Sequence, residues 1–332
     1  QNSCHAGFCV CWEAGERMRK IWIDCDPGVD DAVALSYLAA NREQFAILGV
    51  STVAGNQTIE KVTANALALT EFLNLDVPVV QGAEEPLVAD LGTGAGVHGE
   101  TGLGRHALPK SGRKPVSSSF SDYIAEMTAE WTKEERMTLV ALGPLTNLAM
   151  LIKSKPQIRD RIEEIIFMGG AAWGGNVTAS AEFNIYTDPE AAKIVLDAGI
   201  PAVMCGLDVT MKSGFTRRQI SKRCQIGGRV SGLCGEWIAE FLSSPVYEVQ
   251  PVLPVHDVVP IMYLLHPEIF GGEKLPVDVD CSMGLSRGRT ICDRRYLLDE
   301  EELHVKVLLK ADGNAFQEYL IESLYEMDAE SN

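Results

Sequence analysis

The chain alternates short apolar runs with longer stretches in which apolar and polar positions repeat at the helical period. The short runs, typical of strands, are residues 20–23, 46–54, 77–81, 137–142, 162–168, 202–207, 275–281 and 304–310. Helices are expected just after residue 30, over 58–72, 121–131, 189–198, 233–242, 258–265 and 314–326, and from residue 146. This order predicts an α/β fold with a single large domain, in which a mostly parallel, doubly wound sheet has helices on both faces.

Polar and glycine residues collect where several of the expected strands end. They lie in the acidic segment 24–31 and in the segments after Leu142, Met168 and Leu207. Ligands bind outside the carboxyl ends of the strands in an open parallel sheet. We therefore expect the active site at the strand carboxyl ends, in one crevice lined by residues far apart in the sequence.

Composition narrows the class of protein. The chain has 332 residues, of which 46% are hydrophobic, so it can bury a large core. Its formal net charge of -17 opposes binding to nucleic acid or to an anionic membrane, and no apolar stretch reaches membrane-spanning length. The nine cysteines are mostly scattered, which indicates reduced thiols and a cytoplasmic protein.

The sequence predicts a leader followed by one domain. Residues 1–19 lack the basic start and continuous apolar run of a signal peptide, and we expect them to form a flexible leader. Residues 20–328 are expected to form the domain, because no linker rich in Pro, Gly and Ser divides them.

Four aspartates lie in the segment 24–31, directly after the first expected strand: Asp24, Asp26, Asp30 and Asp31. Pro27 and Gly28 break that strand and turn the chain, so the next helix can begin with Asp30 as its cap. The other three aspartates can then converge on one point. Carboxylate oxygens bind Ca²⁺ or Mg²⁺ better than zinc. Helix capping accounts for one aspartate but poorly for four, and we therefore predict a metal site.

Three other groups of residues carry possible chemistry. Residues 92–96 lack the preceding strand and the spaced helix of a dinucleotide loop, which favours a plain flexible loop. Histidines in such a segment are usually solvated, and the alternative is a mobile lid that brings His98 over a ligand. Glu182 and Asn184 precede a helix expected to be capped by Asp188, and they suit the binding of hydroxyl groups. His256 and Asp257 place an imidazole beside a carboxylate at the start of an apolar helix, a pair that is by itself more often structural than catalytic.

Four separated motifs together resemble those of the inosine-uridine preferring nucleoside hydrolases. They are Asp24-Cys-Asp-Pro-Gly-Val-Asp-Asp31, Ala141-Leu-Gly-Pro-Leu-Thr-Asn147, Met168-Gly-Gly170 with Asn176 and Glu182-Phe-Asn184, and His256-Asp257. The resemblance runs from about Lys20 to the C-terminal helix. It implies hydrolysis of the N-glycosidic bond of purine or pyrimidine ribonucleosides to free base and ribose, by a homodimer or homotetramer.

The resemblance also implies roles for individual residues. A Ca²⁺ ion would be held by Asp26, Asp31, Asp257 and the main-chain carbonyl of Leu142, where some members have Thr. Asp26 would deprotonate the metal-bound water, with Asp24 as a supporting carboxylate. The ribose would contact Asp30, Asn56, Asn176, Glu182 and Asn184, and Met168 would pack near the sugar or base. His256 would assist the leaving base, with His98 as the next candidate, and the His98 loop and residues 236–250 would contact the base.

The chemistry supports this reading, although two others stay open. Cleaving an N-ribosidic bond develops positive charge on the sugar, which an anionic cluster stabilises, and the leaving base needs a proton donor. Asp24-Cys-Asp26 also resembles the motif of Mg²⁺-dependent phosphatases of the haloacid dehalogenase type. The pair His256-Asp257 does not fit the pattern of those phosphatases. A non-catalytic ribonucleoside-binding protein is the third reading. Uridine, xanthosine, inosine, adenosine and a cytokinin riboside all remain candidate substrates.

Overall fold

Eight strands form one central sheet in the computed structural model, which describes residues 18–223, 227–243, 247–248, 250–295 and 303–330. The strand order is β3-β2-β1-β4-β5-β6-β12-β9, and every neighbouring pair is parallel except β12 with β9. The bounds are β1 Arg19–Cys25, β2 Phe45–Thr52, β3 Val79–Gln81, β4 Met137–Ala141, β5 Ile162–Met168, β6 Ala202–Cys205, β9 Phe270–Leu275 and β12 Val305–Ala311. The predicted α/β fold is confirmed.

The longer helices are α1 Val29–Ala40, α2 Ile59–Phe72, α4 Phe120–Met127, α5 Thr146–Ser154, α7 Pro189–Leu196, α9 Arg217–Arg223, α10 Arg229–Glu240, α11 Val258–Leu265 and α12 Gly313–Glu330. Short helices are α3 Ala95–His98, α6 Phe183–Thr187 and α8 Leu207–Thr210. None of the helices in the described ranges is long and apolar enough to cross a membrane.

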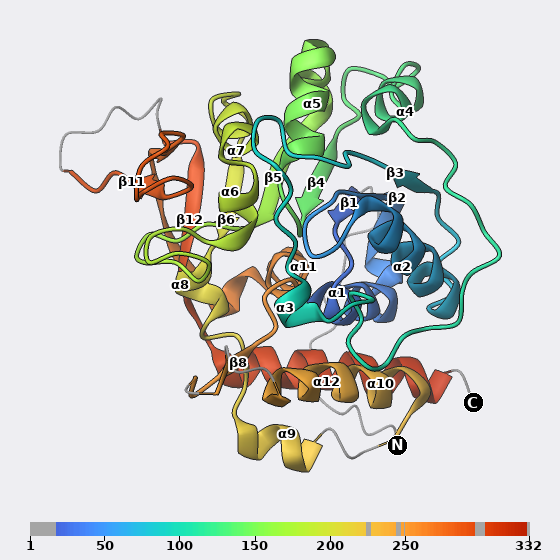
Figure 1. The fold of residues 1–332 in the computed structure, drawn as a ribbon. Helices are drawn as coiled ribbons and strands as arrows, with labels where there is room; N and C mark the ends of the chain where they lie inside the picture. The colour runs from blue at the N-terminus through green and yellow to red at the C-terminus, as the bar shows by residue number, and fades with distance from the viewer. Residues whose placement is uncertain (1–17, 224–226, 244–246, 249, 296–302, 331–332) are drawn as a thin grey trace, which may run out of the picture.

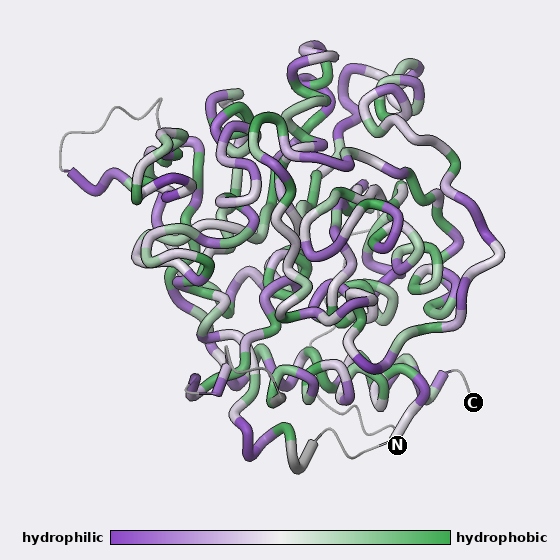
Figure 2. Tube along the Cα trace, in the orientation of Figure 1, coloured by the Kyte–Doolittle hydropathy of each residue, from purple (hydrophilic) through white to green (hydrophobic). Residues whose placement is uncertain are grey.

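Helices cover both faces of the sheet because successive side chains of a strand point to opposite faces. Ile21 and Ile23 of β1 enter a core shared with α1, α2, α10, α11 and α12, whereas Trp22 enters a second core shared with α4, α5 and α7. Figure 1 shows α10 and α12 at the bottom of the view and α4, α5 and α7 at the top. In Figure 2, α10 and α12 alternate between hydrophobic and hydrophilic residues, as expected of helices that bury one face.

The prediction of one strand over 275–281 is wrong. Pro276 separates β9 from β10 (Val277–Val279), because proline has no N–H to continue a ladder. β9 stays in the main sheet, whereas β10 pairs antiparallel with β11 (Thr290–Cys292) in a separate hairpin. A third small sheet joins β7 (Gly214–Phe215) to β8 (Leu253–Pro254). The run 202–207 also ends early, since Leu207 begins α8.

The strand order places the acidic segment beside the residue that follows β4. The sheet is extended in one direction from β1 through β2 and in the other through β4, so the carboxyl ends of β1 and β4 form the switch point where ligands bind in doubly wound folds. The backbone N–H of Leu142 donates to the carbonyl of Asp24 at 2.7 Å. Apart from residues 18 and 19, the expected leader lies outside the described residues.

Candidate active site

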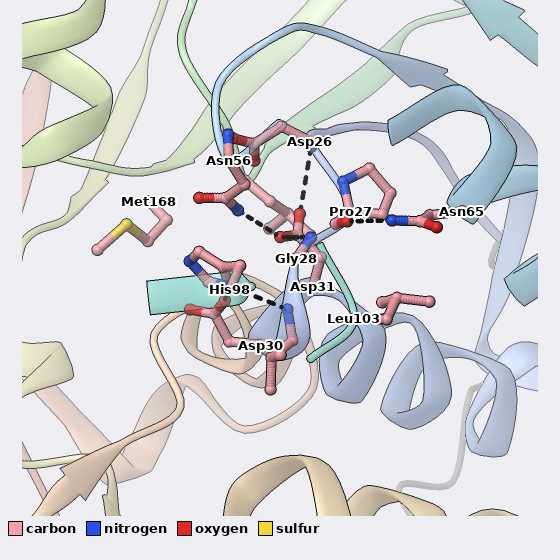
Figure 3. Close-up of polar contacts among 12 residues, drawn as sticks. Asp26, Pro27, Gly28, Asp30, Asp31, Asn56, Asn65, His98, Leu103 and Met168 are labelled. Atoms are coloured by element: carbon pink, nitrogen blue, oxygen red, sulfur yellow. Dashed lines mark hydrogen bonds and ion pairs between the residues drawn. The ribbon is translucent and has the colours of Figure 1, made fainter. Parts of the chain in front are cut away.

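The acidic segment forms a tight turn between β1 and α1. Gly28 is the N-cap of α1, and the carboxylate of Asp31 accepts hydrogen bonds from the backbone N–H groups of Gly28 (2.9 Å) and Asp26 (3.3 Å) (Figure 3). The prediction that Asp30 caps this helix is wrong, because a carboxylate at the third helical position is the one that reaches back to the N-cap. Asp30 lies in the first turn instead.

Asp26 is buried in a space that two glycines keep open. Its Oδ2 accepts a hydrogen bond from the backbone N–H of Asn56 at 2.7 Å, whereas its Oδ1 is buried without a partner among the described residues. A Cβ at Gly55 or Gly143 would lie 2.2 or 2.7 Å from a carboxylate oxygen of Asp26, so both positions require glycine. An unpartnered buried carboxylate oxygen is unfavourable unless a ligand binds it.

Asp24 is held by side chains from two neighbouring elements. Its Oδ1 accepts hydrogen bonds from Ser51 Oγ of β2 (2.5 Å) and Asn147 Nδ2 of α5 (2.7 Å). Asn147 also donates to the carbonyl of Thr52 (2.9 Å) and accepts from the N–H of Ala83 (2.8 Å). Burial raises the pKa of Asp24 to about 7, although the two side-chain hydrogen bonds act to lower it. The sequence did not indicate Ser51 or Asn147 as partners.

Three buried carboxylates form a group that could hold a metal ion. Asp30, Asp31 and Asp257 each bring one oxygen to within 4.8 Å of the others. Burial raises the pKa of Asp30 and of Asp31 to about 6 and that of Asp257 well above its usual range. Repulsion from neighbouring carboxylates adds to the shifts of Asp31 and Asp257. A divalent cation would relieve this repulsion, and oxygen ligands suit Ca²⁺ or Mg²⁺.

Two of the predicted metal ligands belong to this group, and a third, Asp26, adjoins it. Asp31 and Asp257 belong to it, whereas its third member was expected to bind ribose. Asp26 touches the group through its N–H bond to Asp31, and burial followed by the charge of Asp31 raises its pKa well above the usual range. The carbonyl of Leu142 accepts a hydrogen bond from Asn184 Nδ2 at 2.7 Å. The buried, unpartnered Oδ1 of Asp26 and the crowded carboxylates fit a bound cation.

A cavity of about 640 Å³ opens beside the carboxylates. Every predicted substrate-binding residue lines it: Asp30, Asn56, His98, Met168, Asn176, Glu182, Asn184 and Asp257. His256 and Leu142 line it as well. Ligand pockets of small molecules have volumes of about 300–1,000 Å³, so the cavity is large enough for a nucleoside.

Glu182, Asn184 and Asn176 are partly committed to the fold. Glu182 is the N-cap of α6, and its oxygens accept from the backbone N–H groups of Asn184 (3.0 Å), Gly170 (2.9 Å) and Ile185 (3.2 Å). Burial nevertheless raises its pKa to about 7. Asn184 Nδ2 donates to the carbonyls of Leu142 and Met168, and Asn176 Oδ1 accepts from the N–H of Phe183. The Oδ1 of Asn184 and the NH₂ group of Asn176 are the atoms these bonds leave for a ligand.

Two buried histidines line the cavity from opposite parts of the chain. His98 Nδ1 accepts a hydrogen bond from the N–H of Val29, the first residue of α1, at 3.1 Å (Figure 3). A neutral His98 therefore carries its proton on Nε2. His256 Nδ1 lies 2.8 Å from Thr210 Oγ1. Burial lowers the pKa of each imidazole to about 4.

The glycine-rich loop that carries His98 is anchored by hydrogen bonds from Asn65 of α2 and from Gln57, which lies just before that helix. Asn65 Nδ2 of α2 donates to the carbonyls of Pro27 (3.0 Å) and Thr101 (2.9 Å), and Gln57 Nε2 donates to that of Gly99 (2.8 Å). These bonds place His98 over the acidic turn in this structure. The expected movement of this loop stays a prediction.

Sequence reasoning missed several residues that line the cavity. The segments after Met168 and Leu207 were predicted to line the crevice, but Trp173, Asp208 and Met211 within them, and Leu207 itself, were not identified. From the expected base-contacting segment 236–250, Tyr247 and Gln250 line the cavity. The available signal was that the first four lie in the segments that follow β5 and β6.

Comparison with protein families and known proteins gives a consistent result. The model for the inosine-uridine preferring nucleoside hydrolase family matches residues 21–318. The pyrimidine-specific ribonucleoside hydrolase RihA of Shewanella sp. (strain ANA-3) is 39% identical over 312 residues, which cover 92% of this chain and 96% of that protein.

Two solved structures share the fold over nearly the whole chain. The plant nucleoside hydrolase PpNRh1 has a TM-score of 0.84 and 29% identity, covering 93% of this chain and 99% of its own. A purine-preferring ribonucleoside hydrolase from Gardnerella vaginalis has a TM-score of 0.83 and 29% identity, with the same coverage.

Proposed function

The chain belongs to the inosine-uridine preferring nucleoside hydrolase family, a family of enzymes, and we propose that it hydrolyses the bond between base and ribose in ribonucleosides with Asp26 as general base and Ca²⁺ as cofactor. The observation that carries this proposal is the buried carboxylate group at the edge of a cavity lined by amide, carboxylate and imidazole side chains. A Mg²⁺-dependent phosphatase would also hold its cation with carboxylates, so the match of the nucleoside hydrolase family model over residues 21–318 is what favours this reaction.

The acidic end of the site would hold the cation and the sugar. Asp26, Asp31, Asp257 and the carbonyl of Leu142 are the proposed ligands, and Asp30 lies close enough to join them. A bound Ca²⁺ ion would lower the pKa of a coordinated water and orient the ribose diol. Asp26 would accept the proton of the attacking water through Oδ1, the oxygen that no described protein group contacts by a hydrogen bond.

The ribose is proposed to bind through its hydroxyl groups. Asn184 Oδ1 and the NH₂ group of Asn176 remain available after their contacts within the protein, and Glu182 can accept one further hydrogen bond. The carboxylates also stabilise the positive charge that develops on the sugar as the bond to the base breaks.

Release of free base from a nucleoside tests the function directly. The protein is incubated with uridine, inosine and p-nitrophenyl phosphate, and base, ribose and phosphate are measured. We expect base and ribose in equal amounts and no phosphate. Phosphate release would favour the phosphatase, and binding of nucleoside without any product would favour a ribonucleoside-binding protein.

A pyrimidine ribonucleoside is the proposed preferred substrate. The relative named pyrimidine-specific is 39% identical to this chain, whereas the one named purine-preferring is 29% identical. We expect a higher kcat/KM for uridine than for inosine. A higher value for inosine would contradict this preference and leave the reaction type unaffected.

Removal of the metal is expected to abolish turnover. The crowded carboxylates repel one another without a dication, so treatment with a chelator should remove activity and added Ca²⁺ should restore it. Ca²⁺ should also raise Tm, because a ligand at about 100 times its Kd stabilises the folded state by about 2.7 kcal/mol. The control is a Mg²⁺ addition at the same concentration. Full activity in a sample shown by elemental analysis to be free of metal would contradict the metal assignment.

His256 is proposed to assist departure of the base by donating a hydrogen bond to it, since the lowered pKa leaves its imidazole neutral at pH 7. His256→Ala should therefore lower kcat for inosine by about 10²-fold or more, but affect p-nitrophenyl riboside much less, since that leaving group departs without a proton. The ratio of the two rates is the measurement. His98→Ala serves as the comparison, because His98 caps α1 through Nδ1. Equal losses on both substrates would assign His256 an orienting role instead.

A further inference from the structure

The loop between β5 and α6 is held by hydrogen bonds from its backbone up to residue 172. The N–H of Gly170 donates to Glu182 Oε2 (2.9 Å), that of Ala171 to Thr290 Oγ1 (2.9 Å), and that of Ala172 to Asp208 Oδ2 (2.6 Å). Three successive backbone groups are thus bound by side chains from the end of the loop itself, from β11 and from α8. The residue that follows them, Trp173, therefore starts from a fixed backbone position.

Trp173 is a large aromatic residue that the fold leaves open. Its side chain lines the cavity, yet it is 60% exposed. The guanidinium of Arg294, beyond β11, lies over the ring, 4.6 Å from its centroid, and Arg294 is in turn bound to Glu273 Oε1 of β9 at 3.0 Å. One face of the indole is thus covered by a cation, and the exposure belongs to its other face and edges.

Two glycines that line the cavity border open space. Gly174 follows Trp173 and Gly96 belongs to the His98 loop, and neither has an atom within 4 Å of an added Cβ. The hydrogen-bonding groups that suit ribose belong to the acidic end of the cavity. A base attached to that ribose must occupy the part lined by the loops.

We propose that Trp173 stacks on the nucleobase and adds to affinity most strongly for bicyclic bases. This proposal rests on the proposed function, because it needs a nucleoside with its ribose at the carboxylates. A ring already held by Arg294 and by a fixed backbone loses little conformational freedom on binding. Any base can stack on an indole because every base has a π-face, and a purine overlaps the ring over a larger area than a pyrimidine does.

The test compares Trp173→Ala with the wild type on inosine and uridine. Stacking acts on the bound substrate and the transition state alike, so KM should rise while kcat changes little. We expect KM for inosine to rise about 5- to 100-fold, with a smaller rise for uridine. Trp173→Phe should restore KM to within about 3-fold of the wild type, because a phenyl ring keeps a face for stacking, and inhibition by free ribose should not change.

Arg294 gives a second, independent variant. Arg294→Met removes the cation from the ring and should raise KM for inosine by about 2- to 5-fold. Arg295→Met is the matched control, because the neighbouring guanidinium pairs with Asp293 and the two variants change net charge equally. A rise of the same size in the Arg295 variant would make the effect one of charge and overturn the role of Arg294.

Tryptophan fluorescence separates this proposal from the proposed function. Inosine is titrated into two proteins, one carrying Asp26→Asn alone and the other carrying Asp26→Asn together with Trp173→Phe. Quenching that disappears with the indole supports stacking whether or not the wild type turns over. Unchanged KM in Trp173→Ala together with identical quenching in the two proteins would overturn the proposal. An inactive wild type would instead overturn the proposed function alone.

Discussion

Asp26→Asn is expected to lower kcat by about 10²–10⁴-fold, and by more if it also weakens metal binding, while the protein stays folded. The amide fills the same space between Gly55 and Gly143, and its oxygen can still accept from the N–H of Asn56. It cannot accept a proton from water at the position of Oδ1. The measurement is kcat with uridine and inosine, together with Tm and nucleoside binding.

The matched control for Asp26→Asn is Asp197→Asn, the same change on the surface. Asp197 is exposed at the end of α7 and pairs with the half-buried Lys193, so its substitution should leave kcat unchanged. A near-native kcat in the Asp26 variant would remove Asp26 from the role of base. Asp26 Oδ1 accepts no hydrogen bond from the described residues, so a change at this oxygen should not unfold the chain. Loss of folding in the variant would therefore assign Asp26 a structural role.

The sequence predicts the fold well because each strand carries its own evidence. The side chains of Ile21, Trp22 and Ile23 are all apolar and point alternately to the two faces of the sheet. Both faces therefore need apolar partners, which a sheet covered on both sides supplies. The error over 275–281 arose where an apolar run continued through Pro276, a residue that ends a ladder without changing hydropathy. The local pattern of apolar residues therefore identifies strands and helices better than it identifies which strands pair with one another.

The candidate site shows the same limit more sharply. Strand ends gave the location of the carboxylates, but not that Asp31 rather than Asp30 reaches back to the N-cap Gly28, which depends on one turn of backbone geometry. Asn147 lies 123 residues from Asp24, and only the folded chain brings its amide to that carboxylate. Trp173 is one aromatic residue in a glycine-rich loop, and its significance comes from Arg294 and the cavity rather than from any spacing.

Ribonucleosides are expected to be hydrolysed at a kcat/KM roughly 10⁴-fold or more above that of their 2′-deoxy analogues. The proposed diol contacts come from buried groups around the carboxylate cluster, among them Asp30, whose Oδ1 is buried with no hydrogen bond from the described residues and lies 3.8 Å from His98 Nδ1. When the substrate lacks the 2′-hydroxyl, these groups lose their hydrogen-bond partner but stay desolvated. Inosine with 2′-deoxyinosine, and uridine with 2′-deoxyuridine, are the pairs to measure.

The intrinsic chemistry works against this selectivity, which makes the comparison informative. Deoxyribosides cleave more readily without a catalyst, because the 2′-hydroxyl withdraws electrons from the developing cation. A site that merely held the base and supplied a general acid would therefore favour the deoxy substrates. Comparable kcat/KM values within each pair would mean that Asp30 and its neighbours do not bind the 2′-hydroxyl. Strong selection for the ribonucleoside requires binding energy at that hydroxyl large enough to reverse the chemical order, and the buried, crowded carboxylates are the groups in this cavity best placed to provide it.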